Sequence, residues 1–256
     1  MRTEDFEYLY ALEEGFWWFA GMREVTAALL DPVCPRGRRR AILDAGCGTG
    51  FNLAWLRRYA DGGTVSGVDV STDALRFCRA RGHLDLARAS ATALPFADAT
   101  FDLVTSFDVL VQLPPGDDLL AAREMLRVLR PGGVAFVRVA AYRWMRSGHD
   151  EELNTQTRYS LGDLRGLLSG AGFDVLRATY ANSLLLPAAI VRRHVLKRVG
   201  LADRGSDVKP LPPALRWLNG ALASALDLEA RWLRSTRLNL PAGLSAVCVV
   251  QKPDDE

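Results

Sequence analysis

Residues that bind metals or form covalent cross-links are scarce in this chain. Its 256 residues include four cysteines and three histidines. The cysteines form no C-x-x-C pair and show no metal-ligand spacing with the histidines, so the sequence predicts neither a metal site nor a disulfide framework. Unpaired cysteines are the norm in a reducing compartment, and we therefore expect a cytoplasmic protein.

Long apolar runs and blocks of like charge are also missing. No run approaches the roughly 18 apolar residues that mark a membrane-spanning helix, and the charged N-terminus leads into no signal-peptide core. The net charge of +2 is small and the basic residues are dispersed, which argues against a nucleic-acid partner. An apolar fraction of 49% and a charged fraction of 24% are typical of a globular protein. The length suits one α/β domain, with or without an appended cap.

What the sequence does contain is a strand, a glycine turn and a helix in direct succession. Residues 41–43, Ala-Ile-Leu, form a short apolar run typical of a strand that is buried on both faces of a parallel sheet. Gly46, Gly48 and Gly50 follow, and they allow the backbone to approach a ligand closely. Residues 51–59 then place apolar side chains at helical spacing. This succession indicates a cofactor site.

The spacing of the glycines indicates the kind of cofactor. Dinucleotide sites use G-x-G-x-x-G, whereas Phe51 stands where the third glycine of that pattern would fall. Asp44, at the end of the first strand, would repel a pyrophosphate but suits a ligand that carries an ammonium group. Both features disfavour a nicotinamide-dependent oxidoreductase, a rival interpretation that a titration with NAD would test.

Two segments resemble motifs of one known family. Residues 44–50, Asp-Ala-Gly-Cys-Gly-Thr-Gly, resemble the first motif of class I S-adenosylmethionine (SAM)-dependent methyltransferases. Residues 129–133, Leu-Arg-Pro-Gly-Gly, between a predicted helix and a predicted strand, are similar to a second hallmark of that family. The resemblance covers roughly residues 39–139. It implies SAM as the cofactor and a Rossmann-like α/β fold, a mixed seven-stranded sheet with helices on both faces.

Asp69 is the strongest single-residue assignment. It lies near the end of the predicted second strand, residues 64–70, about 20 residues after the glycine turn, where an acidic side chain can accept both ribose hydroxyls of a nucleoside. The alternative role for an acid here is to cap the next helix, but Ser71 or Thr72 fills that role better. The matching acid binds the ribose in class I methyltransferases, so the resemblance implies the same role for Asp69.

The remaining cofactor contacts follow from the same resemblance. Val70 would line the adenine pocket, and residues 89–98 resemble the family stretch that reads the adenine edge. Ser90 stands where the family usually has aspartate, and its hydroxyl accepts a hydrogen bond from an amine more weakly than a carboxylate does. The complete set of expected cofactor-binding residues is Asp44, Gly46, Cys47, Gly48, Gly50, Asp69, Val70, Ser90, Ala91 and Phe107.

The implied chemistry is direct displacement of a methyl group from a sulfonium by an acceptor nucleophile. Alignment of donor and acceptor supplies much of the acceleration, so an acceptor that is already nucleophilic needs no general base. Many relatives have a histidine where this chain has Gln112, which cannot take a proton. His149 and Tyr159 are the catalytic candidates, because their irregular segment lies above the cofactor in the common fold and histidine exchanges protons near neutrality. A surface histidine without a catalytic role is the alternative for His149.

Two segments flank or interrupt the predicted single domain, which spans residues 1–256. Residues 1–38 are rich in aromatic side chains and are similar to helical arms that cover the cleft in some bacterial methyltransferases. We expect this arm either to pack on the core or to form a lid. Residues 182–236 precede the last predicted strand and are expected to form a helical cap over the cleft. The alternative is a basic amphipathic surface that meets a membrane or an anionic, lipid-like acceptor.

These observations predict a SAM-dependent methyltransferase that acts on a small-molecule acceptor, aromatic or lipid-like. Enzymes that methylate amino groups or bases often have an Asn-Pro-Pro-Tyr-type motif after the fourth strand, where this chain has residues 108–110, Asp-Val-Leu. The rival from another class is a non-catalytic protein of the same fold that serves as a binding or membrane-associated module. The sequence leaves open the acceptor, its reacting atom and the oligomeric state.

Overall fold

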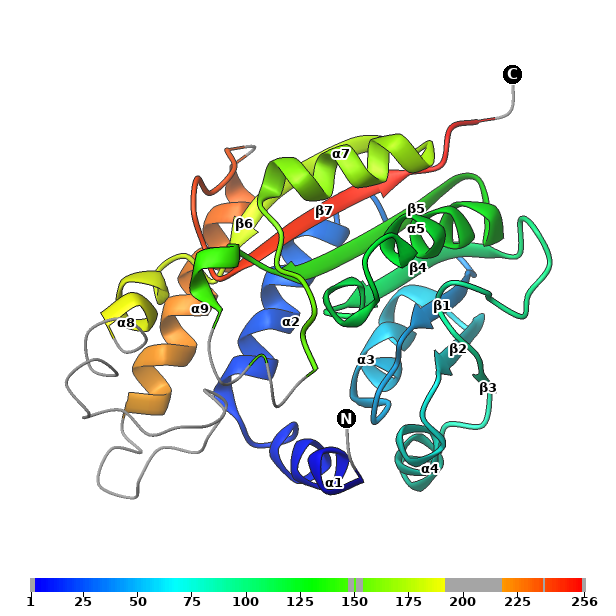
Figure 1. Ribbon diagram of the computed structural model, residues 1–256, viewed down its shortest axis with the longest axis horizontal. Helices are drawn as coiled ribbons and strands as arrows, with labels where there is room; N and C mark the ends of the chain where they lie inside the picture. Colours follow the sequence, from blue (N-terminus) through cyan, green and yellow to red (C-terminus); the bar gives the residue numbers. More distant parts are fainter. Residues whose placement is uncertain (1–2, 147–149, 151–153, 192–217, 237, 255–256) are drawn as a thin grey trace.

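The computed structural model describes residues 3–146, 150, 154–191, 218–236 and 238–254, which fold around one sheet (Figure 1). The sheet has seven strands in the order β3-β2-β1-β4-β5-β7-β6. Strand β7 runs antiparallel to both of its neighbours, whereas the other strand pairs are parallel. The predicted mixed seven-stranded sheet with helices on both faces is confirmed.

The strands lie where the apolar runs of the sequence predict them. They are β1 (Ala41–Ala45), β2 (Thr64–Asp69), β3 (Leu86–Arg88), β4 (Phe101–Phe107), β5 (Leu129–Ala140), β6 (Asp174–Ala181) and β7 (Ser245–Gln251). Strand β5 starts before the expected residue 134, because Leu129 pairs with Phe101 ahead of the glycine turn and Val134 pairs with Leu103 after it. Strand β1 has β2 on one side and β4 on the other. The strands before β4 are therefore added toward one edge of the sheet, and those from β4 on toward the other edge. Such a switch point opens a crevice at the carboxyl ends of the strands.

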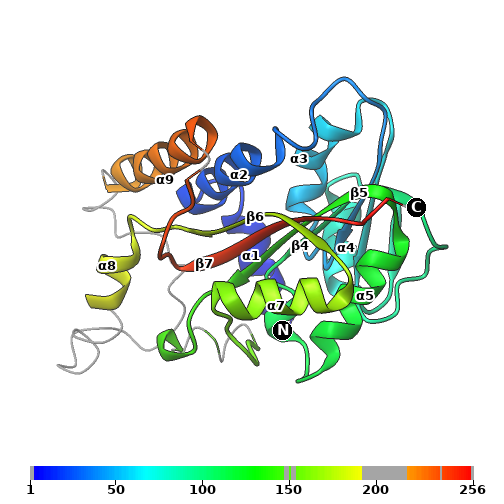
Figure 2. The same cartoon turned by 90° about the horizontal axis from the view of Figure 1, so that it is seen from above.

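The helices form one layer on each face of the sheet. They are α1 (Thr3–Leu12), α2 (Trp17–Leu30), α3 (Phe51–Ala60), α4 (Thr72–Ala80), α5 (Asp117–Val128), α7 (Leu161–Ala171), α8 (Leu186–Ile190) and α9 (Leu218–Ser235), with 3-10 turns η1 (Leu110–Gln112) and η2 (Arg143–Met145). Helices α2, α3 and α9 cover one face, and α5 and α7 cover the other (Figure 2).

Alternation along β5 divides its side chains between these two layers. Ala135 and Val137 pack with α5 and α7, whereas Val134 and Phe136 pack with α2 and α9. Arg138 continues the second series, so its side chain lies on the face that α2 and α9 cover. A buried arginine thus ends an apolar series near the carboxyl end of the strand, which is the end where ligands bind in open α/β sheets.

The N-terminal arm and the segment before β7 pack against each other. Helix α2 lies along α9 (Figure 2), and the contact is so close that a Cβ on Gly21 would lie 2.4 Å from Cδ1 of Leu226. Residues 192–217, which make up much of the predicted cap, lie outside the described residues, so both the cap and its alternative, a basic amphipathic surface, stay predictions there. No helix in the described part of the chain is long and apolar enough to cross a membrane.

Candidate active site

A cavity of about 890 Å³ opens at the carboxyl ends of β1, β2, β4 and β5, beneath the N-terminal arm. Its volume lies within the range of about 300–1,000 Å³ that is typical of small-molecule sites. We call one part the glycine half, which is lined by Gly46, Gly48, Asp69, Val70, Ser90 and Ala91. We call the other part the arginine half, which is lined by Asp108, Arg138, Asp150, Arg158, Leu185 and Leu222.

The glycine turn connects β1 to α3. Gly46, Gly48 and Gly50 have φ angles of 87°, 54° and 80°, a region that residues with a Cβ rarely adopt. A Cβ on Gly46 would lie 2.2 Å from Cγ2 of Val109, so the turn packs tightly against the segment after β4. A Cβ on Gly48 would meet no atom within 4 Å. The backbone at Gly48 therefore borders open space, which leaves room for a ligand.

Asp69, at the end of β2, both supports this turn and lines the cavity. Its Oδ2 accepts a hydrogen bond from Gly48 N at 2.9 Å, and its Oδ1 accepts one from Ser71 N at 2.9 Å. Burial raises the pKa of the carboxyl group, and the two backbone donors oppose that shift. Each oxygen keeps a further lone pair, so Asp69 can still accept hydrogen bonds from ligand hydroxyls. As predicted, Ser71 supplies the helix cap, because its Oγ accepts from Ala74 N.

Val70, Ser90 and Ala91 form the far end of the glycine half. The Val70 side chain is 61% exposed, which leaves an apolar surface that a planar ligand group could cover. The Ser90 hydroxyl lies 2.7 Å from Thr92 Oγ1 and accepts a hydrogen bond from Thr92 N. Its own loop therefore fixes the Ser90 hydroxyl at the cavity wall.

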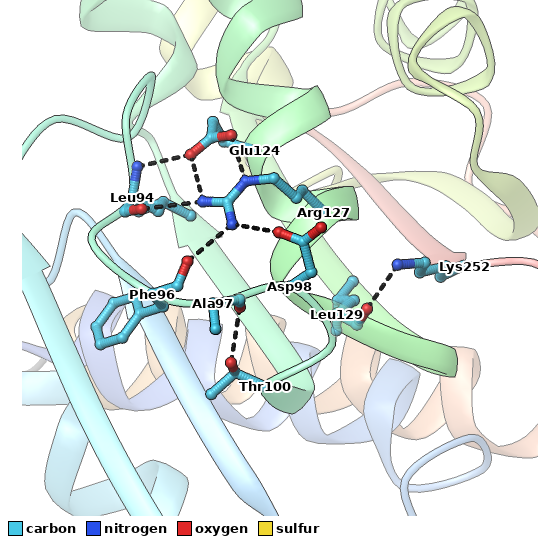
Figure 3. A network of polar contacts seen from close by, with 9 residues as sticks. All are labelled: Leu94, Phe96, Ala97, Asp98, Thr100, Glu124, Arg127, Leu129 and Lys252. Carbon is cyan, nitrogen blue, oxygen red and sulfur yellow. Dashed lines mark hydrogen bonds and ion pairs between the residues drawn. The ribbon is translucent and has the colours of Figure 1, made fainter.

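A side-chain network holds the loop that follows Ser90 (Figure 3). The Arg127 guanidinium on α5 donates to the carbonyl oxygens of Leu94 at 3.0 Å and of Phe96 at 2.7 Å. Glu124 accepts from Arg127 and from the N–H of Leu94, and its hydrogen bond with Arg127 lowers its pKa. Helix α5 thus fixes the loop that shapes this end of the cavity.

Asp44 and Gly50, two predicted cofactor ligands, support the cavity wall from behind and are not among its lining residues. Asp44 is 1% exposed, and its Oδ1 accepts a hydrogen bond from Thr105 Oγ1 at 2.8 Å. Burial raises the pKa of Asp44 to about 7. Gly50 begins α3, where a Cβ would lie 2.9 Å from Cys78 Sγ. The other predicted cofactor residues, Cys47 and Phe107 included, line the cavity.

Arg23 on α2 is a cavity residue that the sequence analysis missed. Its guanidinium carbon lies 3.4 Å from the centroid of the Phe51 ring, and its Nη2 donates to Phe51 O. Its Nε is buried and has no hydrogen-bond partner among the described residues. Burial lowers the pKa of Arg23 to about 10. The sequence did contain an indication of this position. Arg23 lies four residues after Phe19 in the same helix, so it shares the face of the helix that carries Phe19.

The N-terminal arm is tied to the glycine turn through Glu13. The Glu13 carboxylate accepts hydrogen bonds from Thr49 Oγ1, within the turn, and from Arg81 Nη2 at 3.0 Å. Arg81 also donates to Tyr10 O and lies 4.2 Å from the Tyr10 ring centroid. Burial raises the pKa of Glu13, while Thr49 and Arg81 oppose the shift. The aromatic residues that the arm adds to the cavity wall are Phe6, Tyr8, Phe16, Trp17, Trp18 and Phe19.

An ion pair between Asp108 and Arg138 joins the ends of β4 and β5. Arg138 Nε and Nη2 donate to Asp108 Oδ2 at 2.9 and 2.6 Å. Asp108 has a φ of 58°, a conformation that residues with a Cβ adopt rarely and that clusters at functional sites. The ring centroids of Trp18 and Phe107 each lie 5.1 Å from the guanidinium carbon of Arg138.

Further polar groups line the arginine half. Arg158 Nε donates to Asp150 Oδ1 at 2.6 Å, and both side chains are buried. Asn182, just after β6, is 4% exposed, and its Oδ1 has no hydrogen-bond partner among the described residues. The apolar residues that complete this half are Trp18, Met22, Leu185, Ala189, Leu222 and Leu244.

The two predicted catalytic residues differ in what the structure shows. His149 lies outside the described residues, so its role stays a prediction. Tyr159 packs in the core with α5 and α7 and is not among the residues that line the cavity. Its hydroxyl donates to Asp118 Oδ2 at 2.8 Å, and burial together with this hydrogen bond raises its pKa. This placement gives Tyr159 a structural contact and does not support the catalytic role expected from the sequence.

Comparison with known sequences shows a similarity to methyltransferases over part of the chain. Residues 43–137 match a family described as a methyltransferase domain. A probable SAM-dependent methyltransferase of Mycolicibacterium smegmatis is 33% identical over 166 residues, 64% of this chain and 61% of that protein. A fatty-acid O-methyltransferase of the same species is 36% identical over 97 residues, 37% of this chain and 35% of that protein. The matches thus span about a third to three-fifths of the length of these relatives.

Comparison with solved structures agrees. A SAM-dependent methyltransferase from Archaeoglobus fulgidus has a TM-score of 0.59 at 15% identity, over 96% of this chain and 99% of that chain. At this identity the likeness shows the fold. Residues 43–137 and the fold of the chain are thus similar to those of class I SAM-dependent methyltransferases, a class whose methyl donor is S-adenosylmethionine.

Proposed function

We propose that this protein transfers a methyl group from SAM to a small-molecule acceptor with an aromatic or lipid-like body. The observation that carries the proposal is one cavity with two unlike halves. Open backbone and a carboxylate line the glycine half, whereas two ion pairs lie beside apolar side chains in the arginine half. The similarity to a fatty-acid O-methyltransferase supports a lipid-like acceptor.

The residues of the glycine half fit the separate parts of SAM. Asp69 has lone pairs left for the ribose hydroxyls. Val70 offers an apolar surface to the adenine ring, and the Ser90 hydroxyl borders its edge. The Arg23 guanidinium borders the cavity and would fit the carboxylate of the methionine part. Open space beside Gly48 leaves room for the chain between these groups.

The protein's main contribution to the reaction would be alignment. When bound, the cofactor supplies a methyl group on a positively charged sulfur, and the acceptor must approach that methyl in line. Phe107 and Asp108, at the end of β4, line the cavity and would set this approach. Such positioning can supply much of the acceleration of a bimolecular step. The positive charge on sulfur disappears as the methyl group moves. The cavity wall beside the reacting atoms therefore needs no additional charged residue to stabilise the transition state.

We propose that the arm, residues 1–38, forms a lid over the bound cofactor. The hydrogen bond between Glu13 and Thr49 supports this, because it joins the arm directly to the turn that would hold SAM. The aromatic side chains of the arm form part of the same cavity wall. A lid in this position would exclude water and commit both ligands to the site.

Calorimetric titration with SAM and with S-adenosylhomocysteine tests the cofactor assignment. We expect the wild type to bind both, and Asp69→Ala to weaken binding by about 100-fold, because that variant loses the ribose acceptor and a support of the turn. Asp85→Ala is a matched control, since Asp85 accepts from Ser66 Oγ outside the cavity. Failure of the folded wild type to bind either ligand would contradict the proposal. Methyl transfer from labelled SAM to a panel of amphipathic acceptors then tests the activity, and binding without any transfer would favour a non-catalytic module.

A further inference from the structure

Arg138 lines the arginine half of the cavity, and only part of its hydrogen-bonding capacity is used. Its Nε and Nη2 both donate to a single oxygen of Asp108. Its Nη1 donates no hydrogen bond to any residue in the described part of the chain. A guanidinium has five N–H donors in a planar fork, so donors of Arg138 remain for a ligand in the cavity.

The surroundings of Arg138 strengthen the hydrogen bonds that its guanidinium donates to a ligand. Its side chain is 8% exposed, and the rings of Trp18 and Phe107 pack near the guanidinium. In such an environment a charged hydrogen bond is stronger than in water, and an unpaired donor is costly. The planar fork of a guanidinium matches a carboxylate in geometry and in charge.

Beyond Arg138 the arginine half combines the buried Asp150–Arg158 ion pair with a set of apolar side chains. The apolar residues that continue the wall come from α2, from α8 with the residue before it, from α9 and from the residue before β7; they are Met22, Leu185, Ala189, Leu222 and Leu244. A ligand that fills this half would gain from burying an apolar body there. The arrangement therefore suits a molecule with an anionic, planar head at Arg138 and an apolar body toward α8 and α9.

We propose that the methyl acceptor is an amphipathic carboxylic acid, bound as its carboxylate by Arg138. This inference rests on the proposed function of the same cavity. A lone pair of a carboxylate oxygen forms the new O–CH3 bond, the S–CH3 bond breaks, and its electron pair stays on sulfur. The products are a neutral methyl ester and a neutral thioether. A carboxylic acid is already ionised near neutral pH, so no proton has to leave and no general base is needed.

Asp108 competes with the acceptor for Arg138, and this gives the proposal a second, opposite test. Arg138→Gln removes the charge that the carboxylate would bind. Asp108→Asn removes the competing carboxylate and leaves the guanidinium free, and asparagine tolerates the positive φ of this position. Arg130→Gln is the matched control, because Arg130 pairs with Asp102 at 2.7 Å outside the cavity.

The experiment is a calorimetric titration of the full chain, saturated with S-adenosylhomocysteine, with dodecanoate and with dodecan-1-ol. In the wild type and in Arg130→Gln we expect dodecanoate to bind at least about tenfold more tightly than the alcohol. Arg138→Gln should abolish this preference, and Asp108→Asn should increase it. All variants should keep their affinity for S-adenosylhomocysteine, which also shows that they are folded.

Three results would overturn the assignment. One is equal affinity of the wild type for the acid and the alcohol. Another is a preference for the acid that survives in Arg138→Gln. The third is a loss of S-adenosylhomocysteine affinity in Arg138→Gln, which would place Arg138 with the cofactor. Failure of the proposed function looks different: the acid preference depends on Arg138, yet labelled methyl from SAM reaches neither dodecanoate nor any other acceptor of the amphipathic panel.

Discussion

The two halves of the cavity are built in different ways. In the glycine half, backbone conformation and one carboxylate make the site, and the turn and its support on β2 lie close together in the sequence. In the arginine half, side chains from α2, β4, β5, α8 and α9 meet across long stretches of chain. Local backbone geometry leaves a readable motif in a sequence, whereas a meeting of distant side chains does not. The experiments below test this contrast, from the largest expected effect to the smallest.

Alanine substitutions at Gly46 and Gly48 should distinguish a glycine that the fold requires from a glycine that the ligand requires. Gly46→Ala should lower the free energy of unfolding by several kcal/mol, because its Cβ would lie 2.2 Å from Val109 and its φ is positive. Gly48→Ala meets no atom within 4 Å, so it should cost only the backbone strain of about 1–2 kcal/mol. Chemical denaturation of both variants measures this difference.

Binding should show the complementary pattern. Gly48→Ala should bind SAM at least about tenfold more weakly, because its Cβ would occupy the open space that borders the cavity. Calorimetry on the folded variant gives this value. Wild-type affinity in Gly48→Ala would show that the cofactor does not approach the backbone there, and the contrast between the two halves would lose its basis.

Arg23 tests whether side chains also matter in the glycine half. Arg23→Gln should weaken SAM and S-adenosylhomocysteine by about ten- to thirtyfold, because it removes a charged donor whose Nε is otherwise unpaired. Methylthioadenosine lacks the carboxylate, so its affinity should be unchanged. The control is Arg130→Gln, because Arg130 pairs with Asp102 and does not line the cavity. An equal loss for all three ligands would place Arg23 at the nucleoside end instead.

Glu13 tests the connection between the arm and the turn. Glu13→Gln should weaken SAM several-fold and increase proteolytic cleavage of the arm, because it replaces a buried carboxylate that accepts from Thr49 and Arg81. Glu14→Gln is a matched control, since Glu14 pairs with the same arginine but its side chain is 72% exposed. If SAM protects the arm of the wild type from the protease to the same degree as that of Glu13→Gln, this carboxylate does not couple the lid to the turn.

The outcome of the sequence predictions follows the same division. The turn and Asp69 could be predicted because their roles depend on strand ends and on backbone conformation, which short-range patterns encode. The same patterns gave no indication of Arg138, because its importance depends on the alternation of β5 and on the packing of α2 against α9. Tyr159 shows the converse, since its segment resembles a catalytic region but its ring is directed into the core.

Asp44 lies beneath the turn, and its titration should affect both the stability of the fold and the binding of the cofactor. Burial raises its pKa to about 7 in the folded state, whereas an aspartate in the unfolded chain has a pKa of about 3.9. The folded state therefore binds the extra proton between about pH 4 and pH 7, so the free energy of unfolding should fall as the pH rises through this range, by up to a few kcal/mol. Asp44→Asn should show a flatter dependence in chemical denaturation.

Cofactor binding should respond to pH with the opposite sign. Ionised Asp44 would favour the ammonium group of SAM from beneath the turn, so the affinity of the wild type should rise several-fold between about pH 6 and pH 8. Asp44→Asn should show no such rise, and the exposed-side control Asp85→Asn should behave like the wild type. A pH dependence that persists in Asp44→Asn would mean that another group titrates. The carboxylate under the turn would then serve the fold through Thr105 alone, and binding in the glycine half would rest on the backbone, Asp69 and Arg23.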